Sequence, residues 1–210
     1  MNKELWITRA RNYCGLLGML LPWLALFSAG IAEHPSPTWW YSISATYYQS
    51  PALVGILTAA SILLMTYDGY DLQDNLVTTF SGVFGLGIVL FPCSVNWLNR
   101  MDPVGFFQIP MTYSNKIHCA CAALFFVLLA YNSFFLFTKY DGNPTKNKLR
   151  RNIVYKVCGL GMLVFMIFQI ISVQVSFLKG YWTMINEIFL LQFFGISWLT
   201  KGGAIKFLND

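Results

Sequence analysis

The chain has 210 residues, of which 56% are hydrophobic and 11% are charged, and its formal net charge is +5. A typical soluble domain has roughly a quarter of its residues charged, so this composition excludes a water-soluble fold. Nucleic-acid binding is not expected either, because the Lys and Arg residues gather in loops between long apolar segments, as they do in membrane proteins.

Six apolar segments each come close to the roughly 20 residues that a membrane-spanning helix requires. We expect spans at residues 13–32, 51–67, 76–92, 115–138, 153–174 and 183–200. The second and third of these segments are the shortest. The fold is therefore predicted to be all-α: a polytopic integral membrane protein whose six-helix transmembrane bundle forms a single domain over residues 1–210.

The distribution of basic residues predicts the orientation of this bundle. The side that holds both termini carries eleven of the fourteen Lys and Arg residues, and the other side carries only Arg100, Lys116 and Lys179. Positively charged loops stay in the cytoplasm. Both termini are therefore predicted to be cytoplasmic, and the protein is expected in the cell (inner) membrane.

One cytoplasmic loop is acidic instead, with Asp68, Asp71 and Asp74 at every third position. Its carboxylates suit either a divalent cation or the positive end of a helix dipole, and the helix start is favoured. The basic stretch 146–151 on the same face is the expected partner. Neither a metal site nor a cofactor is predicted, because the sequence has no CxxC or paired-histidine motif.

The two longer outer loops are expected to contact the membrane surface. The first, roughly 33–50, combines prolines with many aromatic residues and is expected to fold back onto the outer rim. In the second, roughly 93–114, the segment Gly105-Phe106-Phe107 is expected to dip into the interface.

Glycines in the third span, at Gly82, Gly85 and Gly87, allow another helix to approach closely. Packing within the bundle is the favoured interpretation. A contact between copies of the chain in a homo-oligomer is the alternative.

Two ionisable residues, His118 and Glu187, lie about one turn inside the outer ends of the fourth and sixth spans. Such residues are costly in a membrane and therefore indicate function. We expect a polar cleft that opens to the outer leaflet. Alternatively, each residue lies partly hydrated in the headgroup zone, or the two form a structural pair. The predicted ligand-binding residues are Ser42, Ser44, Tyr47, Asn115, His118, Asn186 and Glu187.

Three short motifs resemble the six-span FRAG/DRAM-type membrane protein family and its uncharacterised bacterial relatives. They are Tyr41-Ser42-Ile43-Ser44-Ala45-Thr46, His118 at the start of the fourth span, and Asn186-Glu187 followed by Phe193-Phe194-Gly195. Eukaryotic members are linked to membrane-lipid handling, lipid-anchor remodelling or autophagy. The resemblance implies a shared outer polar cluster of Ser42, Ser44, His118 and Glu187. Ala45 stands where the eukaryotic proteins commonly have Asp, which weakens a catalytic role.

The sequence thus favours a non-enzymatic membrane protein that binds or senses lipid at this cleft. An oligomeric pore or permeabilising effector is one alternative. A lipid-modifying enzyme that uses His118 and Glu187 for proton transfer is the other. No catalytic residue is assigned, because the G-x-S-x-G and H-E-x-x-H motifs are missing. Membrane lipids are the expected partners.

Overall fold

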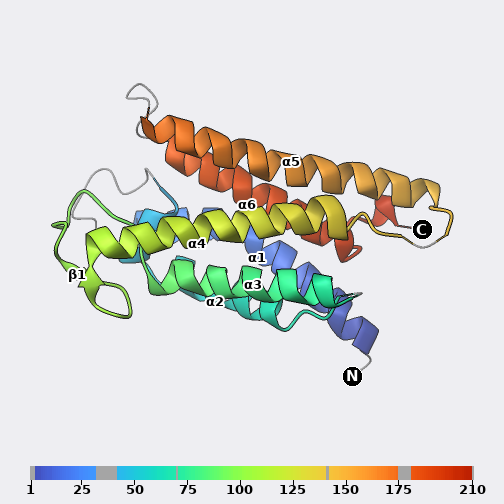
Figure 1. Cartoon of the computed structure of the whole chain (residues 1–210), viewed down its shortest axis with the longest axis horizontal. Helices are drawn as coiled ribbons and strands as arrows, with labels where there is room; N and C mark the ends of the chain where they lie inside the picture. The colour runs from blue at the N-terminus through green and yellow to red at the C-terminus, as the bar shows by residue number, and fades with distance from the viewer. Residues whose placement is uncertain (1–2, 32–41, 70, 141, 175–180, 210) are drawn as a thin grey trace.

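The computed structural model describes residues 3–31, 42–69, 71–140, 142–174 and 181–209. Within these ranges the chain is mostly helical, with six α-helices and one short hairpin (Figure 1). The helices are α1 Lys3–Ile31, α2 Ala52–Met65, α3 Leu72–Leu90, α4 Met111–Tyr131, α5 Lys146–Gln174 and α6 Tyr181–Lys201. Of the loop at roughly 33–50 that is expected to fold back, residues 33–41 lie outside the described residues.

Shorter elements join these helices. The 3₁₀ turns η2 and η5 cover Ser44–Tyr48 and Lys206–Leu208, and a π-helical turn, η3, extends α4 over Asn132–Leu136. Two antiparallel strands, β1 Pro103–Val104 and β2 Ile109–Pro110, form the hairpin before α4.

Three helical stretches in the described part of the chain are long and apolar enough to cross a membrane. They are Glu4–Ile31, Met111–Leu136 and Lys146–Ser172. Helix α2 is apolar but has 14 residues, which corresponds to about 21 Å against a hydrocarbon core of about 30 Å. The prediction of a largely helical chain is confirmed, whereas the number of spans stays a prediction.

Two of the helices begin well before the expected spans. Helix α1 begins at Lys3 rather than at residue 13, and α5 begins at Lys146 rather than at residue 153. A search for apolar segments finds only the part of a helix that suits contact with lipid. Lys and Arg are good helix formers, so the helices continue through the basic residues that precede this part.

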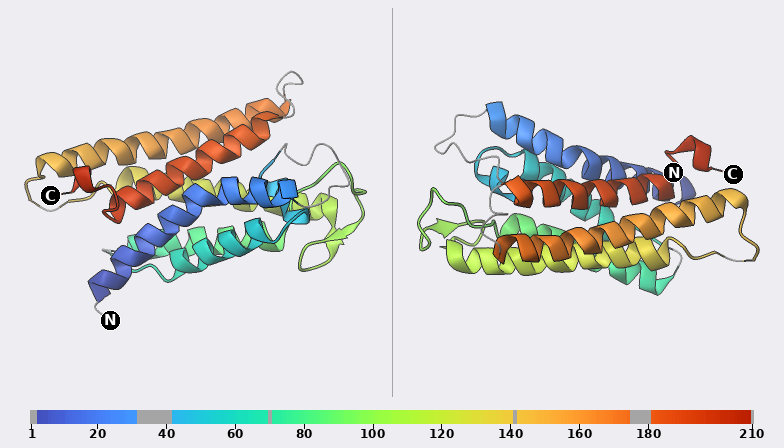
Figure 2. Two further views of the ribbon diagram at one scale, coloured as in Figure 1. Left: turned by 180° about the vertical axis from the view of Figure 1, so that it is seen from behind. Right: turned by 90° about the horizontal axis from the view of Figure 1, so that it is seen from above.

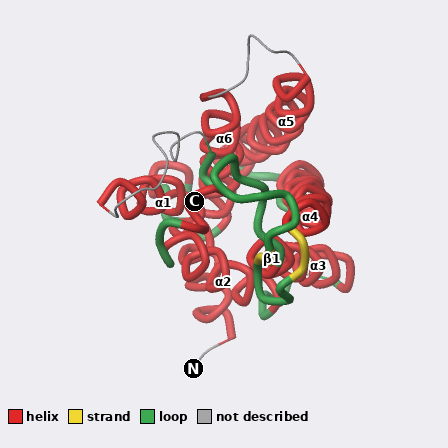
Figure 3. The backbone as a smooth tube through the Cα atoms, turned by 90° about the vertical axis from the view of Figure 1, so that its left-hand side faces the viewer, coloured by secondary structure: helices red, strands yellow, loops and turns green. Residues whose placement is uncertain are grey.

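The helices lie roughly along one long axis (Figure 2). Helix α1 packs against α2 and α6, α3 packs between α2 and α4, and α5 packs against α4 and α6. The end-on view shows these neighbours around the bundle (Figure 3). The largest fully buried side chains include Phe125, Tyr155, Phe194 and Trp198, which mark the centre of the core.

Glycines set the close contacts between helices. A Cβ atom added at Gly15 would meet the backbone of Leu199 and Gly195, so α1 and α6 approach almost backbone to backbone. In α3, Gly82 faces the backbone carbonyl of Ser61 in α2, and Gly85 faces the Ser61 hydroxyl. These glycines are therefore used within the bundle, as the favoured interpretation expects.

The outer face of α5 is apolar along its length. Its exposed side chains recur at spacings of three and four residues: Ile153, Val157, Leu160, Val164, Ile167 and Ile171. This spacing places them on one stripe of the helix. A continuous apolar stripe of this size is unusual on a soluble protein and suits contact with lipid chains.

The two ends of the bundle differ in chemistry. The hairpin end comprises residues 42–51 and 91–110 with the starts of α4 and α6 (Figure 1, on the left). The basic end comprises residues 3–12, 66–74, 137–151 and 198–209, which include most of the Lys and Arg residues.

Candidate functional site

The side chain of Glu187 is the centre of the hairpin end. It projects from the second turn of α6, is partly buried, and accepts hydrogen bonds from a short segment 143 to 145 residues earlier in the chain. The Ser42 hydroxyl donates to Oε1 and Oε2 at 3.1 and 2.9 Å, and the Ser44 hydroxyl donates to Oε1 at 2.6 Å. The backbone N–H groups of Ile43 and Ser44 complete the set, at 2.5 Å to Oε2 and 3.4 Å to Oε1.

This segment leads directly into the 3₁₀ turn η2, whose N–H groups would otherwise lack partners at that end. Thr46 closes the turn by donating its hydroxyl to the Ile43 carbonyl at 2.6 Å. Glu187 therefore fixes the segment that leads into η2 against the start of α6.

The turn η2 rests on a second, smaller core. Ala45 packs in a cluster with Cys93, Val95, Val104 and Met111, which come from the residues before the hairpin, from β1 and from the start of α4. Tyr48 adds a hydrogen bond from its hydroxyl to the Cys93 carbonyl at 2.7 Å. We call η2, residues 92–102 and the β1–β2 hairpin together the cap.

The tip of the hairpin presents aromatic side chains. Gly105 and Gln108 have positive φ angles of 72° and 50°, which reverse the chain between β1 and β2. Between them, the side chain of Phe106 is 74% exposed, and Phe107 is also exposed and stacks on Phe91 with ring centroids 5.0 Å apart. The cap therefore carries an apolar tip, at the segment that was expected to enter the interface.

The other predicted site residues have different partners. The buried ring of His118 forms a hydrogen bond between Nδ1 and the Phe91 carbonyl at 2.9 Å. Asn115 accepts the backbone N–H of Ser94 at 2.8 Å. No hydrogen bond joins His118 to Glu187 in the described part of the chain, so the alternative of a His–Glu pair is wrong.

Asn186 and Tyr47 also face away from the Glu187 carboxylate. The Asn186 side chain is fully buried and donates to Gln169 Oε1 of α5 at 2.8 Å. Tyr47 packs against the main core and meets Tyr48 edge to face, with ring centroids 5.1 Å apart. Of the seven predicted residues, the structure thus brings together Ser42, Ser44 and Glu187. Binding of a ligand by any of the seven stays a prediction.

The acidic loop at the basic end forms a helix start. Asp71 is the N-cap of α3 and accepts the Asp74 backbone N–H at 2.9 Å. Lys139, which lies outside the expected stretch 146–151, contacts Asp71 at 2.8 Å and Asp74 at 3.3 Å. Hydrogen bonding to Lys139 is the main reason that the pKa of Asp71 is lowered, and the same bond raises the pKa of Lys139. Among the described residues, no group of three or more His, Cys, Asp or Glu side chains is placed to hold a metal ion.

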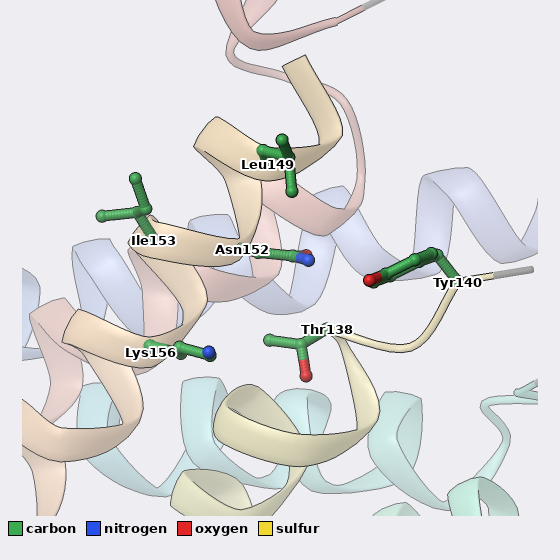
Figure 4. A pocket seen from close by; sticks show the side chains of 6 residues that line it. All are labelled: Thr138, Tyr140, Leu149, Asn152, Ile153 and Lys156. Carbon is green, nitrogen blue, oxygen red and sulfur yellow. The ribbon is translucent and has the colours of Figure 1, made fainter. Parts of the chain in front are cut away.

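Two cavities lie at the basic end. One of about 390 Å³ lies between the end of α4 and the start of α5, where the Asn152 amide and the Tyr140 hydroxyl point toward the same space (Figure 4). A second cavity, of about 510 Å³, is lined by residues of α1, α5, α6 and the loop after α4. Neither cavity is lined by Glu187 or its partners. Glu187 lies about 21 Å along α6 from Lys201, the residue that ends that helix.

Comparison with known proteins found no similar protein. A scan against protein-family models, a search of curated proteins and a search of solved structures each gave no match.

Proposed function

We propose that the chain is a non-enzymatic, six-span protein of the cell (inner) membrane that binds or senses lipid at its hairpin end. Both termini would then lie in the cytoplasm, among the basic residues. The hairpin end would face outward, with the Phe106 tip at the level of the outer headgroups. The three long apolar helices and the apolar stripe of α5 support a membrane location.

The observation that carries the proposal is the position of the Glu187 carboxylate under the cap. Its hydrogen bonds to Ser42, Ile43 and Ser44 anchor η2. The turn η2 then supports the rest of the cap through Ala45 and Tyr48. An exposed aromatic tip on a fixed support is well suited to the interfacial region, where amphipathic and aromatic side chains are favoured.

The contacts of the ionisable residues favour lipid contact over lipid chemistry. Both oxygens of Glu187 accept hydrogen bonds from the chain itself, and His118 is held by the Phe91 carbonyl. A proton-transfer pair needs its groups within hydrogen-bond reach of the reacting atoms. Ser42, Ser44 and Glu187 are therefore assigned to positioning the lipid-contacting surface, with the aromatic tip as the contact itself.

The test compares lipids that co-purify with the protein in mild detergent against the bulk membrane. The variant Phe106→Ser/Phe107→Ser removes the aromatic tip, and Phe207→Ser removes an equally exposed aromatic residue at the basic end, where Phe207 is 78% exposed. We expect wild type and Phe207→Ser to enrich the same lipid classes and the hairpin variant to lose that enrichment. Lipids that match the bulk membrane in all three proteins would refute the proposal.

A further inference from the structure

The smaller cavity at the basic end combines polar and apolar walls. Its volume is about 390 Å³, and it is lined by Thr138, Tyr140, Leu149, Asn152, Ile153 and Lys156. The four lining residues of α5 lie three or four positions apart, so they share one face of that helix. The polar ends of Asn152 and Lys156 extend from this face toward Tyr140 and Thr138 (Figure 4). The cavity thus lies between α5 and the segment that follows α4.

The polar groups of the α5 wall have few partners within the protein. The amide oxygen of Asn152 is buried and accepts no hydrogen bond from the described residues. The side chain of Lys156 is exposed and forms no ion pair within the same part of the chain. A buried polar group without a partner is costly, so an amide in this state favours a ligand. Together with the Tyr140 hydroxyl, the wall offers three groups that can donate hydrogen bonds.

The position of the cavity along α5 suits the edge of a membrane. Residues 157–174 of this helix carry no charged side chain and extend over about 27 Å, against about 30 Å for a hydrocarbon core. Lys156 directly precedes this stretch, at the level where headgroups begin. The apolar stripe of α5 continues from Ile153 at the cavity to Val157 and Leu160, all of them exposed. An apolar surface therefore leads from the cavity toward the hydrocarbon core.

We propose that this cavity binds an anionic phospholipid of the adjacent leaflet, with its phosphate group among Lys156, Asn152 and Tyr140 and an acyl chain along the apolar stripe. Phosphate oxygens accept hydrogen bonds from all three groups, and the bond from the ammonium group is the strongest. Lys146 and Arg150 are exposed within about three turns of Lys156 and add attraction for an anionic leaflet.

The apolar edge of the cavity favours a lipid over a soluble phosphate. Leu149 is 50% exposed and Ile153 is 64% exposed, directly beside the polar groups. A soluble phosphate would leave both side chains uncovered, whereas an acyl chain covers them. The proposal rests on the proposed membrane location, but it does not depend on lipid binding at the cap, which lies at the opposite end of the bundle.

The test measures binding to the purified full chain in mild detergent by isothermal titration calorimetry, corrected for titration into detergent alone. The probes separate the parts of the lipid. Dioctanoyl phosphatidylglycerol has the phosphate, the chains and a net negative charge. Glycerol 1-phosphate has the phosphate alone, and dioctanoylglycerol has the chains alone. Dioctanoyl phosphatidylcholine has the phosphate and the chains but no net charge.

Four single variants divide the charge and the amide of the cavity from their surroundings. Lys156→Gln removes the cation of the wall, and Asn152→Leu removes the amide with little change in size. Arg150→Gln removes an exposed cation of the same helix that does not line the cavity, so it is the matched control. Asp141, which follows Tyr140, lies outside the described residues, and Asp141→Asn tests the effect of its charge.

We expect phosphatidylglycerol to bind wild type roughly tenfold or more tightly than each of the other three probes. Lys156→Gln should weaken this binding roughly tenfold and Asn152→Leu roughly fivefold, because each removes a hydrogen-bond donor to the phosphate. Arg150→Gln and Asp141→Asn should stay within about twofold of wild type or bind more tightly. The hairpin variant Phe106→Ser/Phe107→Ser should also bind as wild type does, which separates this site from the cap.

Any of three results would overturn the proposal. In the first, dioctanoylglycerol or phosphatidylcholine binds as tightly as phosphatidylglycerol, so the anionic phosphate is not recognised. In the second, glycerol 1-phosphate binds as tightly, so the site takes a soluble anion. In the third, Arg150→Gln, Asp141→Asn or the hairpin variant loses as much affinity as Lys156→Gln, so binding lies elsewhere or is diffuse. Gel filtration and thermal unfolding establish that each variant is folded, and Lys156→Gln decides the question if Asn152→Leu does not fold.

Discussion

The Ser44 hydroxyl donates to Glu187 Oε1 at 2.6 Å, although the two residues are 143 positions apart in the chain. With the parallel bonds from Ser42 and Ile43, this contact joins the segment before α2 to the start of α6. A single carboxylate thus joins the turn η2 of the cap to α6. The stability of the cap is expected to depend on that group more than on any one apolar contact.

Replacement of Glu187 by Ala should destabilise the fold by on the order of 3 kcal/mol, because it leaves the donors of Ser42, Ile43 and Ser44 without their acceptor. Thermal or denaturant unfolding in detergent measures this loss. Ser44→Ala alone should cost about 1 kcal/mol. In the double variant the two effects should be coupled by about 1 kcal/mol, and strict additivity would contradict the proposed contact.

Two glycines in helices should respond to the same substitution in opposite directions. Gly15→Ala places a Cβ against the backbone of Leu199 and Gly195 and should cost about 1–3 kcal/mol. Gly55→Ala in α2 meets no atom within 4 Å and should be neutral or stabilise by up to about 1 kcal/mol. Unfolding midpoints of the two variants test this contrast, and equal losses would contradict the close α1–α6 crossing.

The Asp71–Lys139 contact should make stability depend on pH at both extremes. A lowered carboxyl pKa stabilises the fold above the ordinary carboxyl value, and this contribution is lost as the pH falls through the lowered pKa of Asp71. A raised lysine pKa contributes below the ordinary lysine value, and this contribution is lost as the pH rises through the raised pKa of Lys139. The difference in unfolding midpoint between wild type and Asp71→Asn should therefore be largest between about pH 5 and pH 10.

Asn is also a good N-cap, so Asp71→Asn keeps the start of α3 and removes only the charge. Lys139→Gln should give the same pH profile as Asp71→Asn, because each variant removes one partner of the pair. A difference from wild type that stays constant from pH 3 to pH 7 would show that the contact does not contribute through its charge.

The orientation can be tested with reporters. A fluorescent protein fused after Asp210 should fluoresce, and alkaline phosphatase fused there should be inactive, because both termini are expected in the cytoplasm. The same phosphatase inserted between Phe106 and Phe107 should be active. Phosphatase activity after Asp210 would reverse the assignment of the two ends and place the Glu187 cap inside the cell.

The sequence predicts the helices better than it predicts their neighbours. Apolar runs reveal α1 to α6 because each run is long and bounded by polar loops. Grouping Glu187 with Ser42 and Ser44 follows from topology, since all three belong to the same end of the bundle. The end of the bundle at which a residue lies can therefore be inferred without a structure.

The direction in which a side chain points is harder to infer. His118 lies near the start of α4, at the same end of the bundle as Glu187, but its ring contacts the Phe91 carbonyl rather than Glu187. Asn186 precedes Glu187, yet consecutive residues on a helix are about 100° apart, so Asn186 faces Gln169 of α5. The angle between consecutive helix residues can be inferred from the sequence. The presence of Arg11 and Lys201 at one cavity cannot, because it depends on which helices are neighbours.

The pairing of α1 with α6 has a consequence for biosynthesis. The first helix leaves the ribosome early, but the helix that covers Gly15 and the carboxylate that fixes Ser44 are made last. At usual translation speeds the nascent chain waits for on the order of ten seconds with that glycine face uncovered. Loss of the last helix, by a premature stop codon or by proteolysis, would remove the partner of the Gly15 face of α1 and the partner of the η2 turn at once. Such fragments are suited to recognition by cellular quality control.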